Sequence, residues 1–523
     1  MVSTSLISSD YWKTLQVTPH DTEFLHNYLF EREVPLTARE LVPVLVSERM
    51  AAERDALKQQ HESSGKLYFP KETYQAGDNL VFPALSWQKG KVTDVRKGAN
   101  PSAGEFEVIT VSMEDGPERL FAANLAAHTL NDVSTSAPED EHIDVDSILH
   151  ENGSELEMKI EDAFQADDDL VQIAGRWFPR ALLVDVNVGH LNLAEAVLDM
   201  SGGEPQPAAV LLKDVELPAG VNPKLAEFSL NLALQEDERF DEVGPAGRVL
   251  WCLRRLEPQG VREVPSFLQY VPIDHDRSKL TPQMLNLEAQ LDDELSPVHE
   301  TDAGSHKVDA LTLSLIYPHL RAGTLPLSAR ARTLFPTAYE SPRVRFTLVD
   351  GKTGAKMPAW VVRTNGYVYG LREWYKSHVL IPGSLVEIKR SDTPGEVIVE
   401  ARTQRSTKDW VRTLMVGADG GMVFAMLKQP ITAEFNDRMA IFVPDFGLLD
   451  PLWGKKRSFE EIVISIMREL TKLTPQGHVH AQELYAAVNL VRRVPPAPLL
   501  AMLADKPFVH VGDLHFRLGE EDV

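Results

Sequence analysis

The sequence predicts a multidomain α+β protein, because helical and strand-like patterns alternate in blocks along its 523 residues. That length suggests about three to five domains, each large enough to bury its own core. Apolar residues follow helical spacing in residues 20–62 and alternate with a period of two in residues 66–130. Residues 321–420 contain 16 Lys and Arg against 9 Asp and Glu, whereas the whole chain has a net charge of −24. We expect a polyanion to bind at this basic segment.

The composition is that of a water-soluble globular protein, since 43% of the residues are hydrophobic and 25% are charged. No apolar run reaches the ~18 residues of a membrane span, and the N-terminal residues lack the basic and apolar regions of a secretory signal. The single cysteine, Cys252, excludes an internal disulfide and a cysteine metal cluster. We therefore expect a cytoplasmic protein with no membrane partner and no cofactor, in which Cys252 is a buried apolar residue.

The basic segment has the pattern of a small β domain. Asp350-Gly351 is a predicted tight turn after an alternating run, and a second turn is predicted at Pro382-Gly383. A short helix is expected between the third strand and the fourth. The expected strands are residues 344–349, 360–363, 367–369, 385–389 and 395–399, and the expected helix is residues 371–378.

This order of strands, turns and short helix resembles the DNA-binding pseudobarrel of plant hormone-response regulators and of the effector domain of a type II restriction enzyme. The resemblance covers roughly 80 residues, and we assign residues 321–455 to this domain. It implies an open barrel whose two arms enter the major groove of double-stranded DNA. The alternative is that the basic residues are ordinary surface charges of a small barrel. By the resemblance, Arg343 and Arg345 would contact phosphates, and base edges would be read by Lys352, Lys356, Arg363, Asn365, Arg372 and Lys376.

The N-terminal part predicts a helical domain followed by a small β-barrel. Thr37 to Glu40 has the form of a capping box between two apolar helical segments. This pattern resembles the first two helices of the winged-helix module shared by chromatin regulators, restriction enzymes and the delta subunit of bacterial RNA polymerase; an ordinary helical hairpin is the alternative. We assign a winged-helix-like domain to residues 1–65 and a barrel of SH3 or Tudor type to residues 66–132, where short strands are separated by turns.

Residues 133–169 are predicted to be an acidic linker. Between Glu139 and Asp169 there are 13 acidic residues and one basic residue, Lys159. Such a composition is typical of flexible segments. A second interpretation makes the segment a DNA-mimicking strip that folds back on the basic segment and restrains it.

Two further parts of the chain repeat one order of elements. In residues 170–275 and again in residues 456–523, helices are followed by Phe-x-x-Val-Gly, a turn, and an aromatic residue two positions before a leucine. A helix followed by a glycine-turned hairpin is how a winged helix ends, so the repetition predicts a winged helix in each part. Trp251 and Phe516 are the two aromatic residues, and we expect each to cap a core. Residues 276–320 are predicted to be a linker.

The chain lacks the usual catalytic signatures for nucleotide hydrolysis, serine esterases, zinc proteases and dinucleotide binding. His478 and His480 could pair on a metal, but a role in capping a helix explains them more simply, so no metal site is predicted. Asp350 followed by Glu387 and Lys389 has the acid, then acid-x-Lys order of magnesium-dependent nucleases. That order is common on strands, and Asp350 lies in a turn sequence, so we predict no enzymatic activity.

The sequence therefore predicts a non-enzymatic, multidomain protein that binds double-stranded DNA in transcription regulation or in defence. The pseudobarrel-like domain would read the DNA, and the winged helices would add phosphate contacts or bind protein. The first alternative is a protein-interaction scaffold, such as an acidic factor associated with RNA polymerase. The second alternative is the magnesium-dependent nuclease.

Overall fold

The computed structural model describes residues 9–519 except 64, 86–87, 101–103, 115, 132–144, 219, 298–307, 418–419 and 454–456. The chain divides into two compact units, Met1–Leu183 and Val184–Val523. Both units contain helices and sheets, which confirms the predicted α+β class. None of the helices in the described residues combines the length and the hydropathy that crossing a lipid bilayer requires.

The first unit contains a helical part closed by a small sheet. Its three strands lie in the order β1-β8-β7, so β8, the last of the three along the chain, is the central strand. The predicted capping box is confirmed at the start of α3, where Thr37 N–H donates to Glu40 Oε2 at 2.8 Å and Glu40 N–H donates to Thr37 Oγ1 at 3.1 Å. The elements are α1 (Ser9–Thr14), α2 (Pro19–Arg32), β1 (Leu36–Thr37), α3 (Ala38–Ser63), α4 (Val145–Gln165), β7 (Leu170–Ile173) and β8 (Arg176–Pro179).

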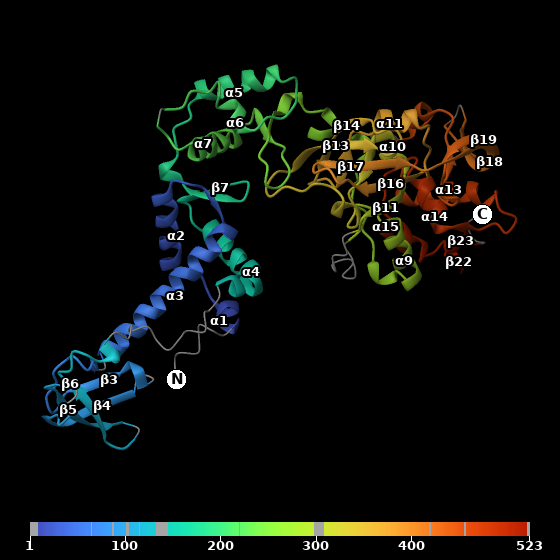
Figure 1. The fold of residues 1–523 in the computed structure, drawn as a ribbon. Helices are drawn as coiled ribbons and strands as arrows, with labels where there is room; N and C mark the ends of the chain where they lie inside the picture. The colour runs from blue at the N-terminus through green and yellow to red at the C-terminus, as the bar shows by residue number, and fades with distance from the viewer. Residues whose placement is uncertain are drawn as a thin grey trace. The chain divides into compact units, whose positions relative to one another are not determined.

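Helix α4 overturns the prediction of an acidic linker at residues 133–169. Residues 133–144 lie outside the described residues, but the rest of the segment forms α4 and packs along α3 (Figure 1). Its buried residues recur every four positions, and Phe164 meets the ring of Trp177 at 5.4 Å. The acidic residues occupy the other face, so their number concealed the helical period. The predicted boundary at residue 170 is also wrong, because β7 and β8 belong to this first unit.

A small barrel-like sheet is inserted between α3 and α4. Its described strands lie in the order β2-β3-β4-β5-β6, with β2 and β3 parallel and the other neighbours antiparallel. The predicted alternation in this region is confirmed, because Leu80, Val92, Ile109 and Val111 point into one core. The strands are β2 (Lys66–Leu67), β3 (Asn79–Phe82), β4 (Gln88–Lys97), β5 (Glu107–Met113) and β6 (Arg119–Ala123).

The second unit begins and ends with helical parts of similar connectivity. In the first, the hairpin β9–β10 is joined by a bridge from Gln206 to Trp251; in the last, the strands lie in the order β21-β23-β22. The first part comprises α5 (Val188–Met200), α6 (Ala208–Leu211), α7 (Pro223–Glu236), β9 (Phe240–Glu242) and β10 (Trp251–Leu253), followed by α8 (Gln259–Arg262). The last comprises α13 (Phe459–Thr471), β21 (Val479–His480), α14 (Ala481–Val488), α15 (Pro496–Leu503), β22 (Phe508–Gly512) and β23 (His515–Leu518).

The same connectivity occurs three times in the described residues: a helix, a short extended segment, two helices and a hairpin whose second strand pairs with that segment. In each copy a buried aromatic residue lies opposite the short segment. The pairs are Leu36 with Trp177, Gln206 with Trp251, and Val479 with Phe516. These aromatic residues are at most 3% exposed. Trp251 and Phe516 therefore cap cores as predicted, and the N-terminal helices form a third copy that the barrel interrupts.

The centre of the second unit is a curved sheet. Its described strands form a seven-stranded sheet in the order β11-β16-β17-β13-β14-β15-β12, in which β13 and β17 are parallel and the other neighbours are antiparallel. The predicted strands and short helix are present (Figure 1). The elements are β11 (Ala310–Ser314), α10 (Tyr317–Ala322), β12 (Thr324–Pro326), β13 (Arg343–Asp350), β14 (Lys356–Val362), β15 (Tyr367–Tyr369), α11 (Arg372–Ser377), β16 (Leu385–Arg390) and β17 (Glu396–Ala401).

Residues 276–320 are not simply a linker, contrary to the prediction. They contain α9 (Pro282–Leu291), the edge strand β11 and most of α10. Leu311 and Leu313 of β11 point into the core of the sheet, and Met284 and Leu287 of α9 join the core of the C-terminal part. The alternation in β11 is too short to predict a strand from the sequence alone, because a strand of this length is specified by its pairing with β16.

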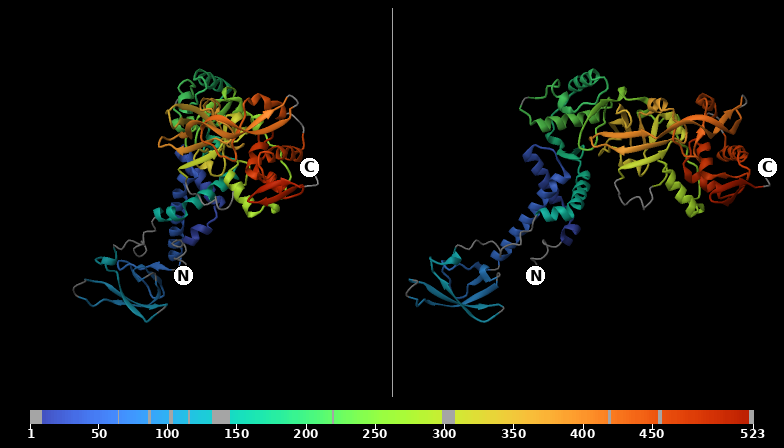
Figure 2. Two further views of the ribbon diagram at one scale, coloured as in Figure 1. Left: turned by 90° about the vertical axis from the view of Figure 1, so that its right-hand side faces the viewer. Right: turned by 45° about the vertical axis from the view of Figure 1, so that its right-hand side comes forward.

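A long hairpin connects the central sheet to the C-terminal helices. Leu414 and Phe424 lie opposite each other on the hairpin and share one core with Val463 and Met467 of α13. Both views of Figure 2 show this hairpin beside the C-terminal helices. The elements are β18 (Thr403–Val416), β19 (Met422–Ala433), β20 (Ile441–Phe442) and α12 (Asp450–Trp453).

Candidate nucleic-acid interface

Arg343 and Arg345, the two predicted phosphate contacts, lie in β13 with most of their surface covered. The Arg343 guanidinium contacts the carboxylate of Asp241 and lies 3.6 Å from Glu257 Oε2, and its Nε donates to the main-chain oxygen of Val261 at 3.2 Å. The Arg345 guanidinium lies over the ring of Trp360 at 5.5 Å, and burial lowers its pKa. These two side chains are therefore committed to contacts within the protein, and a phosphate role does not fit their placement.

Lys352 and Lys356 lie at the turn between β13 and β14. The Lys352 ammonium contacts Thr403 Oγ1, and the Lys356 ammonium contacts the Glu396 carboxylate while 62% of its side chain remains exposed. The Lys356 side of this pair is open to solvent, whereas the Glu396 side chain is only 16% exposed, so the lysine can turn toward another anion while Glu396 stays in place. The turn thus offers two lysines to solvent.

Arg372 and Lys376 lie on the exposed side of α11. Lys376 pairs with Glu373 at 2.8 Å, and both side chains are well exposed. The Arg372 Nη2 donates to the main-chain oxygen of Arg321 at 3.4 Å. α11 therefore presents two further cations that no buried contact restrains.

Asp350 joins the turn to α11. Its carboxylate accepts from Lys352 N–H at 2.8 Å and from Thr353 N–H at 3.4 Å, and it lies 3.5 Å from His378 Nε2. Burial raises the pKa of Asp350, but the hydrogen bonds from the Lys352 and Thr353 N–H groups outweigh burial and lower it. A charged carboxylate thus holds the lysine-bearing turn against the C-terminal end of α11.

Arg363 and Asn365 lie at the opposite end of the sheet. Arg343 pairs with Val362 and Val349 pairs with Lys356, so the turn after β14 is remote from the turn after β13. Arg363 Nη1 donates to the main-chain oxygen of Ser341 at 2.6 Å, and Asn365 is exposed. The eight predicted residues therefore occupy three places, of which one combines Lys352, Lys356, Arg372 and Lys376.

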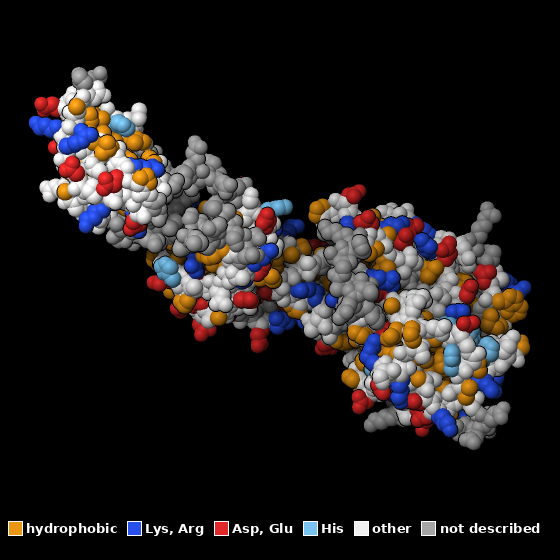
Figure 3. Space-filling model, turned by 90° about the horizontal axis from the view of Figure 1, so that it is seen from below, with side chains coloured by type: hydrophobic (Ala, Val, Ile, Leu, Met, Phe, Trp, Pro, Cys, Tyr) orange, Lys and Arg blue, Asp and Glu red, His pale blue; other side chains and the backbone are white. Residues whose placement is uncertain are grey.

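Acidic neighbours reduce the field of the basic segment. Lys389 lies 3.1 Å from both Glu387 and Glu400, in addition to the pairs already described. The face visible in Figure 3 shows positive and negative side chains interspersed over the second unit. The excess charge found by counting residues is thus spread over several small groups.

Arg321 is a cation that the sequence analysis did not select. It lies on α10 and pairs with Asp450 at 2.6 Å, and it lines one cavity together with Arg372 and Lys376. In the sequence it stands 51 positions before Arg372, at the first position of the domain assigned to residues 321–455. The close approach of Gly323 to the backbone of Arg372 brings the two helices together, and no local pattern encodes that contact.

The carboxylates of the nuclease alternative do not meet. Asp350 lies on the buried face of β13, whereas Glu387 and Lys389 lie on the outer face of β16. Strand β17 separates the two strands, since Val399 pairs with both Asp350 and Ile388. Among the described residues, no group of three or more His, Cys, Asp or Glu side chains is placed to hold a metal ion.

His480 caps α14, as the simpler interpretation predicted. Its Nδ1 accepts from Gln482 N–H at 3.1 Å, and its Nε2 lies 2.9 Å from Arg438 Nη1. Burial and the nearby Arg438 lower the pKa of His480 to about 4. His480 is therefore neutral at pH 7 and serves the fold.

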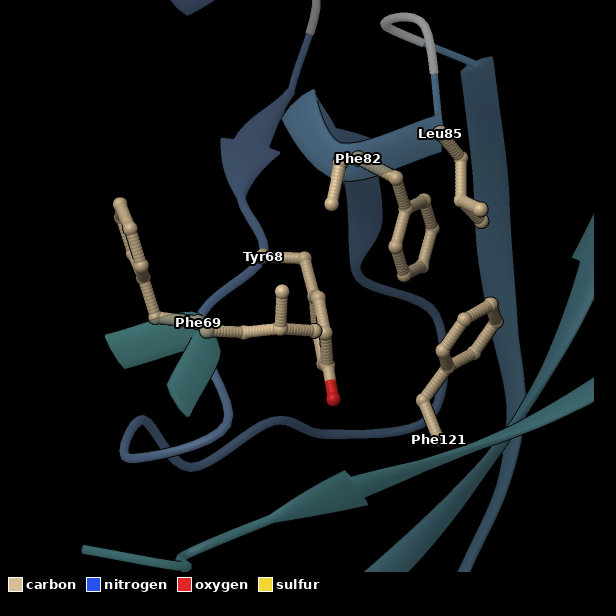
Figure 4. Close-up of a pocket in the computed structure, with 7 residues that line it drawn as sticks. Tyr68, Phe69, Phe82, Leu85 and Phe121 are labelled. Atoms are coloured by element: carbon tan, nitrogen blue, oxygen red, sulfur yellow. The ribbon is translucent and has the colours of Figure 1, made fainter. Parts of the chain in front are cut away.

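The inserted barrel contains a second hollow, of about 80 Å³ and almost entirely apolar (Figure 4). The rings of Tyr68, Phe82 and Phe121 pack against one another with centroids 4.4–5.3 Å apart, so together they form one wall. The Lys71 ammonium lies over the ring of Phe69 at 5.6 Å. An aliphatic side chain suits this hollow better than a cation, because the rings are too close to enclose a cation and Lys71 repels one.

Comparison with protein-family models, with curated proteins and with solved structures gives no match to this chain.

Proposed function

We propose that this protein binds double-stranded DNA without acting as an enzyme, through Lys352, Lys356, Arg372 and Lys376. The observation that carries this proposal is the placement of Asp350, whose carboxylate contacts both the β13–β14 turn and the end of α11. It gathers four exposed or half-exposed cations from two elements at one end of the sheet. When a turn and a helix lie together, some of their cations can contact successive phosphates of the DNA backbone. The remaining side chains can then contact base edges.

In this proposal the seven-stranded sheet is a DNA-binding pseudobarrel, and the three helical copies are winged helices. The proposal is supported by the sheet order, by the two short helices next to it, and by the three hairpins whose second strand is central. The inserted sheet would be a barrel of SH3 type. The winged helices add phosphate contacts or bind protein, and the protein acts in transcription regulation or in defence, in the cytoplasm.

A mobility-shift titration of the full chain with a random-sequence duplex tests the proposal. The double variant Lys352→Gln, Lys356→Gln should bind at least tenfold more weakly, because two charge-assisted phosphate contacts are lost. Lys472→Gln is the matched control, since Lys472 is 66% exposed and is also paired with a carboxylate. Equal binding by the double variant and the control, or no binding by the parent protein, would remove the proposal.

The second candidate function is a protein-interaction scaffold, with RNA polymerase or another protein as partner. It is favoured by exposed apolar side chains on the β18–β19 hairpin and by the apolar hollow of the barrel. The hairpin residues concerned are 37–61% exposed, and such clusters mark contact surfaces. They are Trp410, Met415, Val423, Met426 and Leu427. Purified RNA polymerase should bind the parent protein and lose affinity for Trp410→Ser; unchanged affinity would reject this surface.

A further inference from the structure

A hollow lined by three cations lies in the second unit, between α10 and α11. It has a volume of about 500 Å³, within the range of ligand pockets. Its lining combines three cations with apolar and aromatic side chains and includes no Asp or Glu among the described residues. The lining residues are Phe267, Leu320, Arg321, Arg372, Tyr375, Lys376, Val379, Leu380 and Phe446.

The three cations converge on the hollow from two helices. Arg321 is paired with Asp450, and Lys376 with Glu373, but Arg372 has no carboxylate partner among the described residues. The Lys376–Glu373 pair is well exposed and holds Lys376 only weakly. Converging like charges repel one another, and an anion in the hollow would relieve that repulsion.

The protein holds Arg321 in place before any ligand arrives. Its guanidinium lies over the ring of Phe267 at 4.9 Å and over the ring of Phe446 at 5.7 Å. Its Nε is buried and has no hydrogen-bond partner in the described residues. Gly323, with φ at 74°, closes α10 so tightly that a Cβ there would lie 2.8 Å from the Arg372 backbone nitrogen. Arg321 and Arg372 are thus positioned together by the backbone.

Val379 lines the hollow in a strained conformation. Its φ of 52° lies in the left-handed region, which β-branched residues rarely adopt, and its side chain is 65% exposed. This conformation ends α11, because the Leu380 N–H donates to the main-chain oxygen of Tyr375 at 3.1 Å, as at many helix C-termini. It leaves the Val379 side chain as an exposed apolar group at the edge of the hollow.

We propose that this hollow binds a nucleoside monophosphate, with its phosphate between Arg321, Arg372 and Lys376. Guanidinium groups match phosphate oxygens in geometry and charge. The base would lie against the apolar side, formed by Leu320, Val379 and Leu380. Inorganic phosphate would leave that apolar side uncovered, so both halves of the ligand are needed. The phosphate comes either from a free nucleotide or from the 5′ end of a DNA strand.

Calorimetric titration of the full chain with AMP, GMP, CMP and UMP tests the proposal. At least one of the four nucleotides should bind. If AMP binds, adenosine and inorganic phosphate should each bind at least tenfold more weakly than AMP. Arg372→Gln should weaken nucleotide binding at least tenfold. Arg390→Gln should leave it unchanged, because Arg390 is an exposed cation of the same sheet outside the hollow.

The two sources of phosphate are separated with oligonucleotides. A single strand with a 5′-phosphate that binds at least tenfold tighter than the same strand without it, and tighter than every mononucleotide, identifies a DNA end as the ligand. Mononucleotide binding equal to that of the phosphorylated strand identifies a free nucleotide. Absence of binding by all four mononucleotides and by the phosphorylated strand, or equal binding by Arg372→Gln, overturns the proposal.

Failure of nucleotide binding in the hollow can be distinguished from failure of duplex binding. The double variant Lys352→Gln, Lys356→Gln lies outside the hollow and should bind nucleotides like the parent protein. Loss of duplex binding in that variant with intact nucleotide binding supports a nucleotide site that shares Arg372 and Lys376 with the duplex surface but does not need Lys352 or Lys356. Loss of nucleotide binding in that variant would overturn the assignment of the ligand to this hollow.

Discussion

Arg493 and Asp293 form an ion pair inside the second unit, with 2.6 Å between Arg493 Nη2 and Asp293 Oδ1 and at most 1% of either side chain exposed. The same guanidinium nitrogen lies 2.8 Å from Glu294 Oε1, and the Tyr485 hydroxyl donates to Asp293 at 2.6 Å. His319 of α10 lies 3.1 Å from Glu294. This cluster joins the central sheet to the C-terminal helices by charge, in addition to their shared apolar contacts.

Removing Arg493 should destabilise the second unit severely. Arg493→Leu leaves the carboxylates of Asp293 and Glu294 buried without their cation, which costs about 3–5 kcal/mol. We expect the urea midpoint of this unit to fall accordingly. Arg390→Leu changes an exposed arginine of the same unit and should shift stability by no more than about 0.5 kcal/mol. Similar midpoints for the two variants would contradict a structural role for the cluster.

Protonation of His480 should weaken the fold in mild acid. The pKa of His480 is lowered to about 4 in the folded protein, below an ordinary value of 6.5, so the unfolded chain binds more protons between those values. Stability therefore rises with pH from about 4 to 6.5, by at most about 1.4 kcal/mol per pH unit from this group. His480→Asn keeps a capping side chain and removes the titration. Its thermal midpoint should vary less over this window than that of the parent, and an equal variation would refute the role of His480.

Deprotonation of Glu257 should weaken the fold as the pH rises, opposite to the effect of His480. Burial and the neighbouring negative charge of Asp241 raise the pKa of Glu257 to about 8, above an ordinary value of 4.5. The folded protein then binds more protons than the unfolded chain between these values, and stability from this group falls as pH rises from about 4.5 to 8. Glu257→Gln should raise the thermal midpoint at pH 8 relative to the parent and change it little at pH 5. The exposed control Glu263→Gln should show no such difference.

Salt should weaken binding to duplex DNA in proportion to the phosphate contacts made. Each contact contributes about 0.9 to the slope of log affinity against log salt concentration. We expect the double variant Lys352→Gln, Lys356→Gln to reduce that slope by roughly 2, and Arg363→Gln to leave it unchanged, since Arg363 lies at the other end of the sheet. A slope that is the same in the double variant and the parent would place the contacts elsewhere.

Replacing the aromatic residue of a hairpin should unfold mainly its own helical copy. Phe516 is fully buried opposite Val479, and Phe516→Ala should cost about 3–5 kcal/mol through the cavity it leaves. Hydrogen exchange should rise in α13 to α15 and leave the inserted barrel of the first unit unaffected. Protection lost equally in both units would show that the two unfold as one.

The strands of the central sheet could be predicted because residues such as Val344, Phe346 and Leu348 alternate with polar neighbours, and the Asp350-Gly351 turn separates two such runs. Helix α4 could not be predicted, because the thirteen acidic residues between Glu139 and Asp169 outweighed the four-residue spacing of its few buried apolar positions. The insertion of the barrel between α3 and α4 was also hidden, since sequence neighbours were taken to belong to one domain.

At the candidate interface, counting residues identified the basic segment but could not predict where each of its charged side chains lies in the fold. Arg343 and Lys356 have the same character in the sequence, yet one is held by Asp241 and the other remains mostly exposed. The difference arises from elements about a hundred residues away in the chain, which cover one end of β13 and leave the other open.

The sequence by itself determined the local elements: periodicity, capping residues and turn residues specify strands and helices through interactions between near neighbours. Only the tertiary structure decided which cations face solvent, which carboxylates neutralise them, and that Arg321 and Arg372 border one hollow. Those outcomes depend on contacts between residues far apart in the chain. The physical reason is that charge interactions depend on distance and burial, which no local pattern encodes.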